Sequence, residues 1–205
     1  MRIAILGAGA MGCALARRWA DSGHAVTLSF ARDAQALAKR ASEIGAASAS
    51  VADAVESADV ILFAARWPNL DLVLAQTGSL DGRLLLDCSN PMNDDDTDLV
   101  PGLSGGETLA QRTAARVVKI FNTIPAELLQ APRSKKRFDV LFATDHDDAK
   151  EIAIQLAHGA SFDPVHVGPL SLSGRLESFA LLVAQLAYEQ GDVPELGYRF
   201  RTLDI

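Results

Sequence analysis

The sequence predicts an α/β protein with a Rossmann fold, in which a doubly wound parallel sheet is followed by a small C-terminal α/β extension. Three observations support this prediction. Short apolar runs alternate along the 205 residues with segments of helical periodicity, as in repeated β-α-β units. Two of these runs, 60–64 and 84–86, are apolar throughout, which is typical of parallel strands buried on both faces. The first run, 2–6, leads directly into a G-x-G-x-x-G set.

Local signals set the bounds of the elements. Gly23 follows the first helix as a left-handed C-terminal residue, Asp33 is an N-cap, and Pro68 can begin a helix. In chain order we expect strand 2–6, helix 10–22, strand 25–30, helix 34–43, strand 46–48, helix 51–57, strand 60–64, helix 68–77, strand 84–86, a polar loop 88–104, helix 105–114, strand 116–121, strand 138–143, helix 147–158, strand 162–167 and helix 172–190.

The glycines after the first strand predict a dinucleotide site. Gly7 allows a tight turn, Gly9 lets a pyrophosphate approach the backbone, and Gly12 lets the next helix pack closely on the sheet. The N-terminus of that helix supplies free N–H groups and a partial positive charge. The alternative is a glycine-rich turn that binds nothing. The residues predicted to bind the cofactor here are Gly7, Ala8, Gly9, Ala10, Met11 and Gly12.

The end of the second strand favours NADP over NAD. An NAD site usually has an acidic residue there to hold the ribose 2′-hydroxyl, and this strand has none. Asp33 comes later and is better explained as a helix cap. Ser29 and Arg32 can instead hold a 2′-phosphate, through a hydroxyl and a guanidinium. The alternative is that Arg32 is only a solvated surface charge.

Loops at the carboxyl ends of the strands predict the rest of the site. In a doubly wound sheet these ends meet where ligands bind, so loops 64–68, 87–92 and 121–125 should join the glycine loop. Two of them contain an asparagine with a nearby proline, Asn90-Pro91 and 122–125, although ordinary turn chemistry is an alternative explanation. The cofactor residues expected from the first two loops are Ala64, Ala65, Asn90 and Pro91.

Composition excludes several classes of partner and site. The formal net charge of −7 argues against nucleic acid or an anionic membrane as a partner. We expect Cys13 and Cys88 to be small buried apolar residues. The four histidines lack the spacing of metal ligands. We assign no catalytic residue and no metal ligand, and we expect Lys119 to be a surface or edge cation. No apolar stretch approaches the length of a membrane span and no signal peptide is evident, so we expect a cytoplasmic protein.

Several blocks together resemble the F420-dependent NADP oxidoreductases, whose relatives include bacterial NADPH-binding proteins and the cytosolic domain of membrane ferric reductases. The blocks are 5–12, 18–20 with 23–24, 117–119 through 122–126, 168–170 with Ser173 and 175–177, and 195–197. The resemblance implies that NADPH lies over the glycine loop and that a flat deazaflavin stacks on its nicotinamide. It also places Trp67 near the cofactor, and it implies that the substrate is bound by Asn122, Thr123, Ile124 and Pro125.

The expected function is hydride transfer between NADP(H) and a deazaflavin (F420) or flavin-type acceptor. We expect 1–123 to form the NADP-binding Rossmann domain and 124–205 to complete the acceptor cleft, packed with it as one unit. The alternative is an NADPH-binding sensor, or a ferric or flavin reductase module without F420 activity. A β-hydroxyacid or imine reductase is disfavoured, because too few helical residues remain for its second domain. The apolar stripe on helix 172–190, together with the resemblance, predicts a homodimer.

Overall fold

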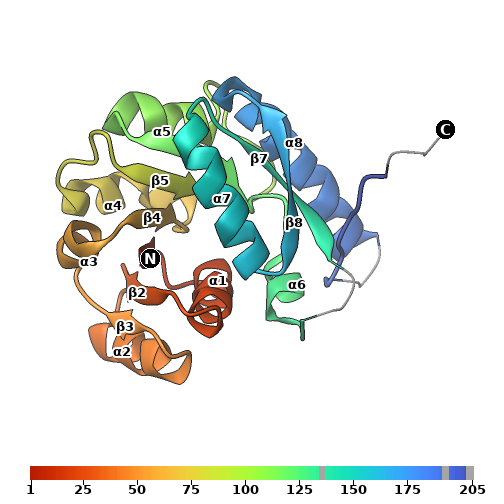
Figure 1. Ribbon diagram of the computed structural model, residues 1–205. Helices are drawn as coiled ribbons and strands as arrows, with labels where there is room; N and C mark the ends of the chain where they lie inside the picture. Colours follow the sequence, from red (N-terminus) through yellow and green to blue (C-terminus); the bar gives the residue numbers. More distant parts are fainter. Residues whose placement is uncertain (134–136, 191–193, 202–205) are drawn as a thin grey trace.

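The structure is a computed structural model that describes residues 1–133, 137–190 and 194–201. Its strands form one sheet in the order β3-β2-β1-β4-β5-β6-β7-β8 (Figure 1). Residues 202–205, the end of the predicted extension, lie outside the described part of the chain. The strands are β1 (Arg2–Leu6), β2 (Ala25–Ser29), β3 (Ala47–Ser48), β4 (Val60–Phe63), β5 (Leu84–Asp87), β6 (Arg116–Ile120), β7 (Phe138–Ala143) and β8 (Phe162–Gly168). The helices are α1 (Ala10–Asp21), α2 (Ala34–Glu43), α3 (Val51–Ser57), α4 (Leu70–Thr77), α5 (Gly105–Thr113), α6 (Ala126–Gln130), α7 (Asp147–Gly159) and α8 (Ser173–Ala184).

The predicted Rossmann fold is confirmed, with one antiparallel neighbour in the sheet. The first six strands run parallel to one another, whereas β7 runs antiparallel to β6 and parallel to β8. Because β7 enters from the edge at which β6 ends, the connection through α6 stays at that edge. Since β7 pairs with β6, the sheet is continuous across the boundary expected at 123/124. Only the end of β7 pairs with β6, so the β7–β8 pair extends beyond the carboxyl end of β6.

Apolar side chains fill both faces of the sheet. In β1, Ile3 and Ile5 belong to one core cluster and Ala4 and Leu6 to another, as the alternation of side chains along a strand requires. Helices α1, α2, α6 and α7 supply side chains to the first cluster, and α3, α4 and α5 supply them to the second. Helix α8 packs through Leu176 against β7. The carboxyl ends of β1, β4, β5 and β6 are thus held at one edge.

Arg18 joins the first β-α unit to the C-terminal part of the chain. Its side chain is buried, and it donates through Nε to the carbonyl of Leu129 at 2.7 Å and through Nη1 to the carbonyl of Ala160 at 2.9 Å. These carbonyls lie at the C-terminal ends of α6 and α7, where a cation is favoured. Burial lowers the pKa of Arg18.

The long helix expected over 172–190 is present, but its hydrogen-bonding pattern changes along its length. A 3₁₀ turn over Leu170–Leu172 precedes α8, and a π-helical turn over Gln185–Glu189 follows it. Of the predicted apolar stripe, Leu176 and Val183 are buried in the core, whereas Leu186 is 48% exposed. The short helix α6 was not expected, because its five residues are too few to show a helical periodicity in the sequence.

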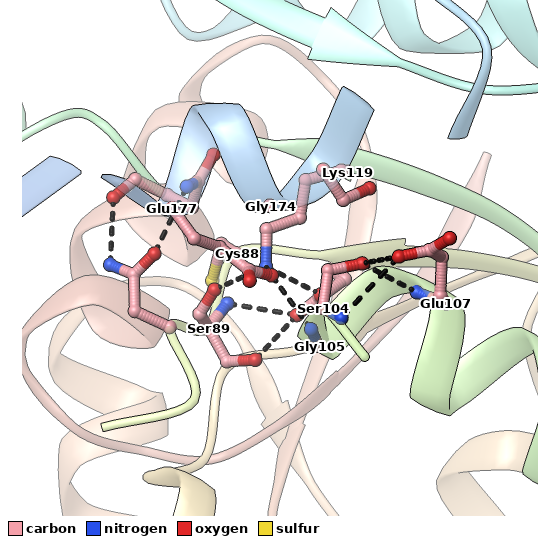
Figure 2. Close-up of polar contacts among 12 residues, drawn as sticks. Cys88, Ser89, Ser104, Gly105, Glu107, Lys119, Gly174 and Glu177 are labelled. Atoms are coloured by element: carbon pink, nitrogen blue, oxygen red, sulfur yellow. Dashed lines mark hydrogen bonds and ion pairs between the residues drawn. The ribbon is translucent and has the colours of Figure 1, made fainter. Parts of the chain in front are cut away.

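Lys119 corrects one prediction, because it is fully buried and not a surface or edge cation. Its Nζ lies 2.8 Å from Asp87 Oδ2 on β5 and 2.7 Å from Glu177 Oε1 on α8 (Figure 2). It also donates to the carbonyl of Ser89 at 2.6 Å. Glu177 accepts from the backbone N–H of Gly105, the first residue of α5, at 2.8 Å. This ion cluster, Lys119 with Asp87 and Glu177, joins two strands and two helices.

Replacing Lys119 by methionine should strongly destabilise the protein. Two carboxylates would remain buried without their cation, and loss of one partner from a buried pair costs about 3–5 kcal/mol. The measurement is the free energy of unfolding from denaturant titration. Lys150→Met is the matched control, because Lys150 pairs with the exposed Asp147, and it should change this free energy little. Equal effects of the two substitutions would contradict the structural role of the cluster.

Candidate functional site

The three glycines of the first loop have different structural roles. Gly7 has a φ of +128°, and a Cβ there would lie 2.6 Å from backbone atoms of Ala64 and Ala65. At Gly12 a Cβ would lie 2.0 Å from the carbonyl oxygen of Gly7. At Gly9 a Cβ would meet nothing within 4 Å. The outer two glycines therefore permit close backbone packing, and Gly9 leaves open space at the N-terminus of α1.

Two adjoining cavities lie at the carboxyl edge of the sheet. The glycine-loop cavity, of about 600 Å³, is bordered by Gly7, Ala8 and Gly9 and by the segment 30–33. The asparagine cavity, of about 320 Å³, is bordered by Asn90 and by 122–126. Ala64, Ala65 and Arg66 border both cavities. An extended ligand can therefore run from the first cavity into the second over the end of β4.

Not every residue predicted from the glycine motif borders the same space. Ala8 and Gly9 line the glycine-loop cavity, whereas Met11 lines the asparagine cavity. Ala10 faces a separate hollow beside Cys13, and Gly12 is buried in packing. The motif thus marks the point at which the two cavities meet α1.

The prediction for Ser29 as a phosphate ligand is wrong, and Arg40 was missed. Ser29 is fully buried, and its hydroxyl lies 3.5 Å from the carbonyl of Ile5. Phe30, with a φ of +60°, then turns the chain outward, so that Arg32 borders the glycine-loop cavity. Arg40 on α2 reaches the same cavity and donates to the carbonyl of Ala8. The sequence signal that could have found it is its place in the predicted helix 34–43, one turn after the apolar Leu37.

Cations gather at the glycine-loop cavity of this acidic protein. Arg32, Arg40 and Arg66 border it, and α1 has no acidic residue in its first turn. Within the described ranges neither Arg32 nor Arg40 forms an ion pair, whereas Arg66 pairs with Asp96. The cavity therefore combines a helix N-terminus with two arginines able to pair with an anion.

Asn90 and Asn122 form an amide pair in the asparagine cavity. Asn90 Nδ2 donates to the carbonyl of Asn122 at 3.0 Å, and Asn122 Nδ2 donates to Asn90 Oδ1 at 3.0 Å. Asn122 Oδ1 is buried and has no hydrogen-bond partner in the described part of the chain. A buried acceptor without a partner is costly, so a donor supplied by a ligand would stabilise it.

The loop that presents Asn122 is held in a strained conformation. Phe121 has a φ of +65°, which is uncommon for a residue other than glycine. Its ring packs between Trp19 and Phe162, with ring-centroid distances of 6.0 and 6.2 Å. Thr123 Oγ1 lies 2.5 Å from the hydroxyl of Tyr198, which fixes the loop from the C-terminal side. Strain maintained by packing in this way is typical of functional sites.

The remaining predicted residues are divided between the cavity and its support. Trp67, Asn122, Thr123, Ile124 and Pro125 border the asparagine cavity. Pro91 is buried and does not border it, although its neighbours Asn90 and Met92 do.

Tyr188 and Glu127 were not singled out by the sequence. Tyr188, on the π-helical turn, borders the asparagine cavity and donates to Glu127 Oε2 at 2.6 Å. Partial burial and this carboxylate raise the pKa of Tyr188. The contact links the turn after α8 to α6 at the rim of the cavity.

No group of three metal-ligating His, Cys, Asp or Glu side chains occurs among residues 1–133, 137–190 and 194–201. None of the helices in those ranges has the length and apolar character needed to cross a bilayer.

Sequence relatives identify the family. The family model described as NADP oxidoreductase coenzyme F420-dependent matches residues 2–91. The F420-dependent NADP reductase of Methanothermobacter thermautotrophicus is 31% identical over 178 residues, which are 77% of this chain and 76% of that protein. Metalloreductase STEAP3 of Rattus norvegicus is 31% identical over 185 residues, which are 88% of this chain but 36% of that protein. The chain thus spans about a third of the metalloreductase.

Solved structures agree with the sequence relatives. A structure from Arthrobacter sp. FB24, for which the name F420-dependent NADP reductase is proposed, has a TM-score of 0.86 at 25% identity and covers 98% of this chain and 100% of its own. A hypothetical protein from Sinorhizobium meliloti has a TM-score of 0.77 at 28% identity, covering 85% and 88%. The imine reductase of Myxococcus stipitatus with NADP+, at 20% identity and a TM-score of 0.64, covers 94% of this chain and 64% of its own and shares the fold. The chain belongs to the F420-dependent NADP reductase family, and it is thereby an NADP-dependent oxidoreductase.

Proposed function

We propose that this protein binds NADPH across the two adjoining cavities and transfers a hydride between it and a flat acceptor of the deazaflavin (F420) or flavin type. The observation that carries the proposal is the junction over Ala64, Ala65 and Arg66. On one side of it lies an open helix N-terminus with two arginines, and on the other a buried amide oxygen without a partner. A dinucleotide has a charged end and a polar aromatic end in this order.

The glycine-loop cavity would hold the phosphorylated end of the cofactor. The free N–H groups of α1 and the open space at Gly9 suit a pyrophosphate. Arg32 and Arg40 suit a 2′-phosphate, because guanidinium groups pair with phosphate oxygens in a planar fork. Arg40 would have a second role, since its bond to the carbonyl of Ala8 also holds the glycine loop.

The asparagine cavity would hold the nicotinamide ring and the acceptor. Asn122 Oδ1 can accept a hydrogen bond from a carboxamide or a ring N–H, and Trp67 offers an aromatic surface. Hydride transfer between two ring systems is chemistry that the cofactors supply, and the protein aligns them and excludes water. On this proposal the reaction requires no acid–base dyad.

Likeness to a metalloreductase supports a second candidate, a module that passes electrons from NADPH through a flavin to ferric iron. The relative is 31% identical over 88% of this chain. In this case the acceptor in the asparagine cavity would be a flavin.

Stopped-flow oxidation of NADPH tests the proposed function. Purified protein is mixed with NADPH and with deazaflavin, FMN, FAD or FMN plus a ferric chelate, and oxidation is followed by absorbance. We expect oxidation with a deazaflavin or flavin. Asn122→Ala should slow it by roughly tenfold or more, because the ring is no longer held, while binding of 2′,5′-ADP in the glycine-loop cavity is unchanged. Tight NADPH binding without oxidation by any acceptor would favour an NADPH-binding sensor instead.

Replacing Arg32 by alanine should weaken NADPH binding but not NADH binding. The loss of a charge-assisted hydrogen bond to the 2′-phosphate corresponds to roughly tenfold in the NADPH dissociation constant. Calorimetric titration of both cofactors measures this. Lys39→Ala is the matched control, since Lys39 is an exposed cation on α2. Equal weakening of NADPH and NADH by Arg32→Ala would remove the 2′-phosphate role from this residue.

The homodimer stays a prediction. Leu182 and Leu186 lie one helical turn apart and are 54% and 48% exposed, which leaves an apolar surface at the end of α8. Sedimentation should therefore give a dimer, and a double substitution of both leucines by lysine should give a monomer. A stable wild-type monomer at micromolar concentration would contradict this prediction.

A further inference from the structure

The ion cluster behind the asparagine cavity has an unbalanced charge. Asp87 and Glu177 each pair with Lys119, and neither carboxylate has another cationic partner in the ranges that the structure describes. The other groups that face the cluster carry no formal charge. They are the N–H groups of Ser89 and Gly105 and the carbonyl and hydroxyl of Ser89. With all three side chains ionised, the cluster carries a formal charge of −1.

The cluster directly supports two parts of the cavity wall. On the β5 side, Ser89 borders the cavity, and Asp87 Oδ1 accepts from its N–H at 2.9 Å and from its hydroxyl at 2.7 Å. On the α8 side, Ala180 borders the cavity three residues after Glu177, on the same helical face. Figure 2 shows Glu177 of α8, Lys119 of β6 and Ser89 after β5 converging on one another. The charge therefore lies one layer behind the cavity surface.

We propose that this cluster is a fixed negative charge that favours the oxidised, positively charged nicotinamide over the neutral reduced ring in the asparagine cavity. Glu177 thus acts on the ring through its charge, from behind the cavity wall. The inference rests on the proposed function, because it requires the ring to lie in this cavity. It makes the bound cofactor a better hydride donor than the free one.

The electron balance shows why the charge affects the reaction. Hydride leaves with both electrons of the nicotinamide C–H bond, and the ring gains one positive charge. The acceptor forms a new C–H bond if it is a deazaflavin, or an N–H bond if it is a flavin, and it takes a proton from water. A negative charge behind the ring attracts the positive charge as it develops.

The expected size follows from Coulomb's law. A unit charge on the order of 10 Å from the ring, at an effective dielectric constant of about 20, changes the affinity for a unit positive charge by roughly tenfold. Burial raises the pKa of Glu177, and Lys119 offsets this only in part. The measurement therefore belongs at about pH 8, well above the ordinary pKa of a glutamic acid.

Glu177→Gln tests the inference without the enzyme reaction. The amide keeps an oxygen for the N–H of Gly105 and leaves Lys119 paired with Asp87, so that the cluster becomes neutral. Calorimetry gives the dissociation constants of NADP+ and NADPH. We expect NADP+ binding to weaken roughly tenfold more than NADPH binding, which raises the potential of the bound two-electron couple by about 30 mV.

The outcomes separate the inference from the proposed function. Equal weakening of both forms, or no change in their ratio, would overturn the inference, because a purely structural effect acts on both. Binding of neither form to the wild type would overturn the proposed function instead. Glu151→Gln on α7 removes an exposed carboxylate and should leave the ratio unchanged. If Glu177→Gln does not fold, Asp87→Asn decides the question with the same expected direction.

Discussion

The buried ion cluster of Lys119, Asp87 and Glu177 is the constraint on which the functional edge of this protein depends. It joins β5, β6, α5 and α8 at a point where none of its charged groups reaches water. A buried pair of this kind contributes little net stability compared with apolar packing, because desolvation offsets the Coulomb attraction. Its effect is to require one arrangement, since any displacement of α8 from the sheet would leave a charge unpaired in the interior.

The geometry of the site follows from this cluster through a chain of hydrogen bonds. Lys119 holds Asp87, Asp87 holds the N–H and hydroxyl of Ser89, and the next residue, Asn90, pairs with Asn122. The strained backbone at Phe121 presents Asn122 from the other side. The buried Asn122 oxygen is thus held in place before any ligand binds, as the proposed alignment of two rings would require.

The parts of the site that depend on local backbone chemistry could be predicted from the sequence. The spacing of Gly7 and Gly12 implied the close contacts that the structure shows, and the position of Arg32 after the second strand placed it at the cavity. The alternation of strands and helices around a largely parallel sheet followed from the apolar runs in the same way. These signals lie within a few residues of the features they specify.

The predictions that failed concern residues whose surroundings depend on partners far away in the sequence. Lys119 resembled an edge cation because its two carboxylates are 32 residues before it and 58 residues after it in the sequence. Ser29 was expected to face the cofactor, but the turn at Phe30 moves the cavity wall to the residues that follow it. The contact of Tyr188 with Glu127 depends on how the end of α8 meets a helix that the sequence did not predict. Tertiary packing decided each of these cases.

A crystal structure of the NADPH complex tests the central claim most directly. Our account predicts the pyrophosphate at the N-terminus of α1, the 2′-phosphate between Arg32 and Arg40, and the nicotinamide in the asparagine cavity with a hydrogen bond to Asn122. A nicotinamide bound outside that cavity, with the Asn122 oxygen still without a partner, would contradict it.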